Sequence, residues 1–136
     1  MADTGFTTEQ LVTIAGGVLL AIAAFLPWAS ASISLGPFGE VGGAVTGIDD
    51  DIGFITLAAG VAAAALAAFS EWNESTIVAA LAAGAIGAVL GLFKFVDYPG
   101  AATIEIGLYL TIVGGIVAAA GAGLAYRNLN QSGSAL

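Results

Sequence analysis

Few residue types in this chain can do chemistry, and most of them are carboxylates. The 136 residues include ten acidic and two basic side chains, with no histidine and no cysteine. Thiolate and imidazole ligands, disulfides, and Ser/His/Asp or Cys/His nucleophilic sites are therefore excluded. A net charge of -8 argues against a basic surface for nucleic acid. We expect no enzymatic activity, no cofactor and no nucleic-acid partner.

The densest acidic cluster is Asp49-Asp50-Asp51, which Gly53 follows. Calcium takes about six to eight oxygen ligands, and a DxDxG spacing supplies some of them. The glutamate that completes an EF-hand loop is missing, because the residues that follow are apolar. We expect the cluster to cap a helix and to be hydrated. The alternative is a cation site, with Asp49 and Asp51 as its candidate ligands.

Three further charged residues lie at the ends of apolar segments rather than in their centres. Lys94 is near the end of one segment, and Asp97 and Glu105 lie on either side of the next connection. A lysine in such a place extends its stem to bring its charge to the membrane interface. We expect Lys94 to form an interfacial ion pair with Asp97 or Glu105. Charge at mid-depth would instead indicate an ion or proton path.

Composition identifies the class of protein. Hydrophobic residues make up 59% of the chain, charged residues make up 9%, and there are 20 glycines. A soluble domain is about 25% charged. So few charges cannot cover a water-exposed surface, which predicts an integral membrane protein. Strong acidity with almost no lysine is typical of organisms that live in high salt, so we also expect a halophilic source.

Four apolar segments are long enough to cross a bilayer, since about 20 helical residues span its hydrocarbon core of about 30 Å. Only helices and closed barrels satisfy the backbone in lipid, and these segments are too continuous for barrel strands. Short connections join the last three, which makes neighbouring helices antiparallel. We expect one domain over residues 1–136, an all-α membrane protein whose four transmembrane helices form an antiparallel bundle. The segments cover residues 9–27, 51–70, 75–96 and 103–126.

The only long connection, residues 28–50, is expected to contain a β-hairpin. Small polar and apolar residues alternate over 30–35, a Gly-Pro turn follows, and residues 40–46 return. Two aromatic residues of this loop, Trp28 and Phe38, are candidate contacts with a partner protein. For both, membrane anchoring is the alternative.

Small residues recur at helical spacing in the third and fourth segments. In lipid, helices associate through such residues because their backbones can approach closely. The pattern indicates either tight packing within one bundle or a face for self-association. A related pattern, TIAGGV at 13–18 and TIVGGI at 111–116, would hint at an inverted repeat of the transporter type. The candidate packing residues are Gly84, Gly87, Gly91, Gly115 and Gly123.

The two basic residues leave the orientation nearly balanced. Arg127 lies on the side of the two termini, and Lys94 lies on the opposite side. Basic residues mark the cytoplasmic side of short loops. Because Lys94 lies inside the end of its helix, we expect cytoplasmic termini and an external loop 28–50.

Several short motifs resemble those of uncharacterised small four-helix membrane proteins of halophilic archaea and actinobacteria. They are Pro27-Trp28 after the first helix, the Asp/Gly stretch at 47–53, and Gly-Leu-Tyr-Leu at 107–110 in a helix that ends near Arg127. The resemblance covers most of the chain. It implies cytoplasmic termini and an external long loop, but no activity. The layout is also similar to that of claudin-type tetraspans, by architecture only, because the paired cysteines of the claudin loop are missing.

We therefore expect a small tetraspan protein with a structural, assembly or interaction role, exerted through its outer loop. Its partners would be the lipid bilayer and either another protein or a second copy of the chain. The alternative is a subunit of an oligomeric channel or transporter, whose pathway would form between copies.

Overall fold

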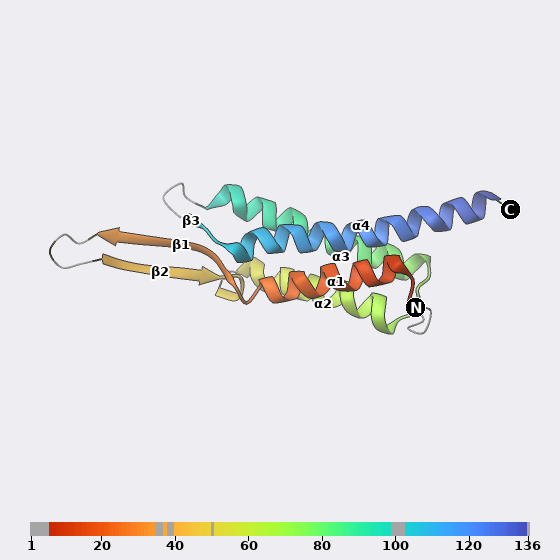
Figure 1. The fold of residues 1–136 in the computed structure, drawn as a ribbon, viewed down its shortest axis with the longest axis horizontal. Coiled ribbons are helices and arrows are strands. Elements are labelled where there is room, and N and C mark those ends of the chain that lie inside the picture. The colour runs from red at the N-terminus through yellow and green to blue at the C-terminus, as the bar shows by residue number, and fades with distance from the viewer. Residues whose placement is uncertain (1–5, 35–36, 38–39, 50, 99–102, 136) are drawn as a thin grey trace.

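A computed structural model of the chain describes residues 6–34, 37, 40–49, 51–98 and 103–135. The helices lie side by side in an elongated bundle, and a β-hairpin projects from one end along the bundle axis (Figure 1). This confirms the predicted helical bundle with a hairpin in its long first loop. The elements in chain order are α1 (Thr8–Ala23), β1 (Pro27–Ser34), β2 (Glu40–Thr46), the short 3-10 helix η3 (Gly47–Asp49), α2 (Asp51–Phe69), α3 (Glu74–Asp97), β3 (Thr103–Ile104) and α4 (Ile106–Ala135).

Helix α1 is shorter than the sequence predicts. It ends at Ala23, and Pro27 opens β1 instead of closing the helix. In between, the backbone N–H of Leu26 donates to the carbonyl of Ala23 at 3.1 Å, so the chain leaves the helix in a tighter turn. A residue that precedes proline disfavours the helical conformation, which prevents the helix from resuming.

Helices α2, α3 and α4 are long and apolar enough to cross a membrane. The qualifying segments have mean hydropathies of 2.2, 2.2 and 1.9. Helix α3 begins one residue earlier than expected, because the side chain of Asn73 accepts a hydrogen bond from the N–H of Thr76 and caps the helix. Helix α4 begins later than expected and continues past residue 126 to Ala135. The segments that qualify are Ile52–Phe69, Glu74–Asp97 and Ile106–Leu129.

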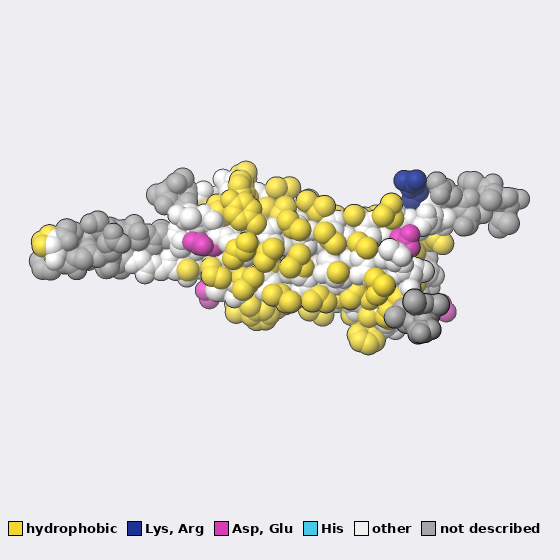
Figure 2. Space-filling model, in the orientation of Figure 1, with side chains coloured by type: hydrophobic (Ala, Val, Ile, Leu, Met, Phe, Trp, Pro, Cys, Tyr) yellow, Lys and Arg dark blue, Asp and Glu magenta, His cyan; other side chains and the backbone are white. Residues whose placement is uncertain are grey.

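The outer surface of the bundle is apolar around its middle. Figure 2 shows hydrophobic side chains over the central part of this face and acidic ones towards its two ends. Soluble monomers rarely expose apolar patches of more than a few hundred Å². This surface suits lipid chains, and it supports a membrane-embedded bundle. Strongly exposed apolar residues include Phe54, Val61, Phe69, Val89, Val96 and Ile116.

Neighbouring helices meet at glycines, where their backbones come into contact. A methyl group placed on Gly84 of α3 would lie 2.6 Å from the backbone nitrogen of Ala119 in α4. One placed on Gly115 of α4 would lie 2.4 Å from the backbone nitrogen of Ala88 in α3. No Cβ tolerates such distances, so this interface needs hydrogen at both positions.

Two more glycine pairs connect α1 to its neighbours. Gly16 of α1 lies against Gly114 of α4, where an added methyl would be 2.8 Å from the Gly114 carbonyl oxygen. Gly17 lies against Gly60 of α2, where the corresponding distance is 2.7 Å. The repeated TIxGG pattern therefore has a packing role, since each Gly-Gly dipeptide serves two interfaces.

The other glycines selected from the sequence face side chains first, and not the backbone of a neighbouring helix. A methyl on Gly87 would meet the Leu20 side chain at 2.5 Å, and one on Gly91 would meet the Ile112 side chain at 2.8 Å. On Gly123, the nearest atom would be a Leu81 methyl carbon at 3.9 Å, which is an ordinary contact. Gly123 is therefore not a position of close helix approach.

Candidate functional site

The hairpin is the largest structural feature outside the bundle, and its register is well defined. Strands β1 and β2 are antiparallel, with Ala31 opposite Gly43 and Ser34 opposite Glu40. The two-residue strand β3 pairs with the other side of β1, which gives the sheet order β2-β1-β3. Strand β3 leads into α4, so the base of the hairpin is held by the bundle.

A β-bulge at Trp28 turns this side chain into the bundle. Pro27 pairs with Thr46 and Ala29 with Val45, so the register skips Trp28. A bulge adds a residue to one strand and redirects its side chain. The Trp28 side chain is fully buried, and its ring N–H donates to the Ala23 carbonyl at 3.0 Å. The prediction that Trp28 contacts a partner is wrong, because it is part of the core.

Two glycines pack in succession behind the Trp28 ring. A methyl on Gly47 would lie 2.7 Å from the ring carbon Cε2. A methyl on Gly53, in the first turn of α2, would lie only 1.5 Å from the carbonyl oxygen of Gly47. We call this arrangement the Trp28–Gly47–Gly53 stack. It joins the base of β1, the end of β2 and the start of α2 at one point.

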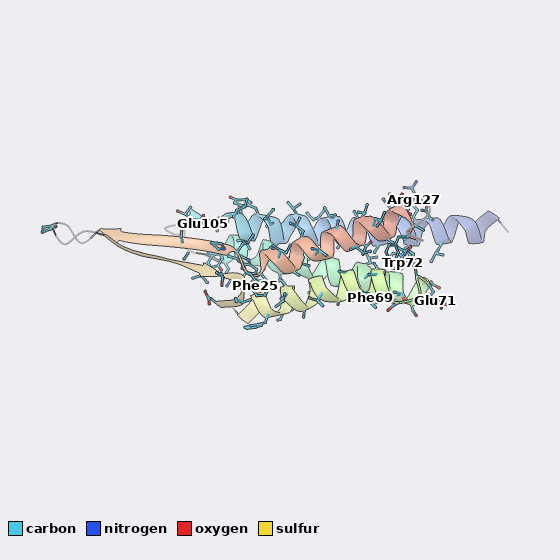
Figure 3. The ribbon with its side chains drawn as sticks, turned by 60° about the horizontal axis from the view of Figure 1, so that its bottom comes forward. Phe25, Phe69, Glu71, Trp72, Glu105 and Arg127 are labelled. Carbon is cyan, nitrogen blue, oxygen red and sulfur yellow. The ribbon has the colours of Figure 1, made fainter. Side chains whose placement is uncertain are left out.

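Glu105 holds the other side of the hairpin base. Its backbone N–H donates to the Trp28 carbonyl at 2.9 Å, and its carboxylate accepts a hydrogen bond from the Ser30 hydroxyl. Figure 3 shows Glu105 at the hairpin end of the bundle, opposite the end that carries Arg127. Glu105 was expected in an ion pair. The structure gives it a structural role at the junction of β1 and α4.

Lys94 and Asp97 approach each other on the last turn of α3. The ammonium nitrogen lies 3.5 Å from a carboxylate oxygen, and the Lys94 side chain is 13% exposed. The same nitrogen lies 4.8 Å from the centre of the Tyr98 ring, a cation–π distance. Tyr98 and the Lys94 stem thus cover this charge at the level where the helix leaves the apolar zone.

The part of the hairpin beyond its base is exposed. Residues 42–45 of β2 are all exposed, and a methyl placed on Gly43 would meet nothing within 4 Å. Phe38, the second candidate for partner contact, lies outside the residues that the structure describes. The described surface of β2 therefore offers backbone, the small residues at 42–44 and the apolar side chain of Val45.

The acidic cluster has only one member with a described side chain. Asp49 is exposed, and its carboxylate accepts a hydrogen bond from the Thr46 N–H at 3.1 Å. It therefore stabilises the turn between β2 and α2 instead of capping α2. Asp50 lies outside the described residues, as does the side chain of Asp51. Over the described part of the chain, no three acidic side chains are grouped as a metal site would require.

The buried threonine hydroxyls are satisfied within single helices, whereas the buried side-chain amide of Gln10 in α1 donates to the Ala67 carbonyl of α2 at 3.1 Å. The hydroxyls of Thr13, Thr56 and Thr111 are fully buried. Each donates to a backbone carbonyl of its own helix, at 2.8, 3.0 and 2.9 Å. Buried hydroxyls commonly satisfy themselves in this way. These threonines therefore stabilise the interior and leave no hydroxyl hydrogen free for a ligand.

An apolar groove runs along the surface between α1 and α2. Its volume is about 420 Å³. Sites for specific ligands combine apolar walls with a few polar groups that fix orientation. Glycine and apolar residues line this groove, so it carries no such group and we assign it no ligand. The lining includes Ile14, Val18, Ile22, Val61, Ala65 and Phe69.

The structure thus brings several predicted residues together at the hairpin base, while their roles differ from those expected. Trp28 and Glu105 lie there as structural residues, and Gly47 and Gly53 join them. The signal for the glycines was present in the sequence, as a glycine on each side of the acidic cluster. Comparison of the chain with models of protein families, with curated proteins and with solved structures finds no match.

Proposed function

We propose that this chain is a multi-pass membrane protein with a structural or assembly role, and that its β1–β2 hairpin is the contact element. The observation that carries the proposal is the geometry of the hairpin. It projects beyond the bundle along the bundle axis (Figure 1), and residues 42–45 are exposed. The base is fixed by buried groups, so the hairpin is presented in a defined direction. A rigid projecting element suits recognition better than a mobile loop, because less order must be gained on binding.

In this proposal α1 is the fourth membrane crossing. Its 16 residues extend for about 24 Å at 1.5 Å per residue. Phe25 and Leu26 lengthen the apolar segment beyond the helix, and Phe25 is 56% exposed. Small differences between helix length and bilayer thickness are accommodated at modest cost. The three longer helices then set the thickness, and α1 fits beside them.

We also propose that the ends of α1 and α4 away from the hairpin are cytoplasmic. Arg127 lies at that end (Figure 3), and basic residues favour the cytoplasmic side. Lys94 lies at the hairpin end, but its charge is paired with Asp97. The balance between the two cations therefore favours an external hairpin, as does the resemblance to small membrane proteins of halophilic archaea and actinobacteria.

Single-cysteine labelling in intact cells is expected to report this orientation. The natural chain has no cysteine, so Ala44→Cys and Leu129→Cys each introduce one thiol. Both positions are exposed, one on β2 and one near the end of α4. A membrane-impermeant maleimide should label Ala44→Cys in intact cells and Leu129→Cys only after permeabilisation. The opposite pattern would reverse the proposed orientation.

Shortening the hairpin is expected to remove assembly while keeping the bundle. In the variant, an Asn-Gly turn replaces residues 32–42, so the pair Ala31–Gly43 closes the strands. Asn-Gly suits a two-residue hairpin turn. The full-length chain, extracted from its native membranes, should elute in a complex larger than its 13.3 kDa. The shortened chain should elute without that complex.

The melting temperature of the purified variant serves as the control. The Trp28–Gly47–Gly53 stack and the Glu105 hydrogen bonds remain in the shortened chain, so its thermal unfolding should match that of the full-length protein. A complex that survives the shortening would show that the hairpin is not the contact element, and the proposed function would fail.

A further inference from the structure

A pocket with both polar and apolar walls lies at the end of the bundle away from the hairpin. Its volume is about 190 Å³, and residues from α1, α3, α4 and the connection between α2 and α3 meet around it. Figure 3 shows Trp72 at this end, which is also the end that carries Arg127. Specific ligand sites combine apolar walls with a few polar groups, as this pocket does. The lining includes Glu9, Trp72, Ile77, Ala125, Asn128 and Leu129.

The inner wall of the pocket is apolar. Ile77 of α3 and Ala125 of α4 are both buried and belong to one hydrophobic cluster. The Trp72 side chain packs against this cluster but is only half-buried, so part of its surface faces the pocket. An aromatic ring attracts cations to its face, and tryptophan does so most strongly. This wall can therefore contact methyl or methylene groups, and its ring adds attraction for a positive charge.

Glu9 supplies the charge of the pocket. One of its carboxylate oxygens accepts a hydrogen bond from the side-chain amide of Asn128 at 2.9 Å, which holds the carboxylate between α1 and α4. Within the described residues, its other oxygen has no hydrogen-bond partner. Arg127 is exposed and does not line the pocket, and the ion pair of Lys94 with Asp97 is at the hairpin end. The Glu9 charge is therefore available to a cation from outside the chain.

We propose that this pocket binds the methylated ammonium group of an organic cation, with Glu9 as the counter-ion and Trp72 as the aromatic contact. A methylated ammonium carries its charge beneath an apolar surface, so it matches the carboxylate and the carbon-rich wall together. A bare calcium ion would need about six to eight oxygen ligands, which this wall does not supply. An anion would be repelled by Glu9. The site is independent of the hairpin, and it adds a ligand to the proposed function.

Two sources can supply such a group at this place. The pocket lies where the bundle leaves the membrane, so a lipid headgroup of the choline type reaches it from the bilayer. A free small cation reaches it from the aqueous side. The chemistry of recognition is the same for both, and the lipid composition of the test membrane distinguishes them.

Tryptophan fluorescence of the full-length protein, reconstituted in phosphatidylglycerol nanodiscs, measures binding. The chain has two tryptophans, and Trp28 is fully buried at the hairpin end, so a change on titration reports on Trp72. Choline is the probe. The first control is the neutral analogue of choline in which carbon replaces the nitrogen, and the second is sodium chloride at equal concentration. We expect a saturable change with choline and none with either control.

Glu9→Gln is expected to weaken choline binding at least roughly tenfold, because it removes the opposite charge at close range. Glutamine can still accept the hydrogen bond from Asn128, so the melting temperature should change little. Glu71→Gln is the matched control, since Glu71 is exposed at the same end of the bundle (Figure 3) and does not line the pocket. It should bind choline like the natural sequence.

Three results would overturn the proposal. They are no saturable change with choline, an equal change with the neutral analogue, and equal weakening by Glu9→Gln and Glu71→Gln. A role of Glu9 in packing alone would lower the melting temperature of Glu9→Gln and leave no difference between choline and its neutral analogue.

Phosphatidylcholine nanodiscs then identify the source. If the lipid headgroup occupies the pocket, added choline should have no effect in these nanodiscs while it binds in phosphatidylglycerol. If the ligand is a free cation, choline should bind equally in both. The shortened-hairpin variant should bind choline like the full-length chain, because the pocket lies at the other end. Failure of this proposal is thereby distinguished from failure of the proposed function.

Discussion

Replacing Gly53 with alanine is expected to lower the free energy of unfolding by about 3 kcal/mol or more, the upper end of overpacking costs. The added methyl would lie 1.5 Å from the carbonyl oxygen of Gly47 and 2.0 Å from its carbonyl carbon. Gly47 has no space to move into beside its Cα, because a methyl placed there would lie 2.7 Å from both the Ala24 carbonyl oxygen and the Trp28 ring. Thermal unfolding in detergent, followed by far-ultraviolet circular dichroism, measures the effect.

Gly43→Ala is the matched control for this substitution. It adds the same methyl to a glycine of β2, at a position with no atom within 4 Å. Its melting temperature should equal that of the natural sequence. If Gly53→Ala melts at that same temperature, the three residues of the Trp28–Gly47–Gly53 stack are not in the contact described.

Replacing Gly115 with alanine is the second large expected effect, a loss of about 1–3 kcal/mol from overpacking. The new methyl would lie 2.4 Å from the Ala88 nitrogen and 2.8 Å from the Gly84 carbonyl oxygen. Both are backbone atoms of α3, so relief requires moving the whole helix. The expected result is a lower melting temperature together with greater protease sensitivity of the α3–α4 pair.

Gly123→Ala provides the control within the same helix. Its nearest contact would be a Leu81 methyl carbon at 3.9 Å, so the added methyl fits. Alanine is also favoured over glycine in a helix by about 1 kcal/mol. The control should therefore unfold at an equal or higher temperature. Equal destabilisation by both substitutions would show that α4 is sensitive to any side chain, and close approach at Gly115 would not be the cause.

Much of the architecture follows from hydropathy, because burial in lipid requires long apolar helices. The positions where helices end depend on other interactions. Residues 24–26 are as apolar as α1 itself, so hydropathy continues to Pro27 while the helix stops at Ala23. At this end the Ala23 carbonyl accepts from the Leu26 N–H and from the Trp28 ring N–H, two local contacts that hydropathy does not reveal. For α4 the predicted end is too early, because the polar residues beyond the apolar segment remain helical.

The candidate site was harder to predict, because the type of a residue does not show whether its side chain points into the bundle or away from it. Trp28 follows a proline at a helix end, a position that suggests an interfacial aromatic. The bulge that turns it inward depends on how β1 pairs with β2. Small residues were predicted to mediate packing, and Gly84 and Gly115 do lie in backbone contact. The spacing of small residues in the sequence could not distinguish Gly84 and Gly115 from Gly123. The face that a helix turns towards its neighbours depends on the rotation of the helix about its own axis, which packing determines.

The paired glycines of α1 and α4 also determine the cross-section of the bundle. Consecutive residues of an α-helix point about 100° apart, since there are about 3.6 residues per turn. Gly16 faces α4 and Gly17 faces α2, while Gly114 faces α1 and Gly115 faces α3. In cross-section, the two neighbours of α1 therefore lie in directions about 100° apart, and so do the two neighbours of α4. The four helices thus form a roughly square arrangement. The glycines of α2 and α3 contact α1, α4 and η3, so the α2–α3 side of the square relies on side-chain packing. If the bundle opens sideways, that is the side where it will open.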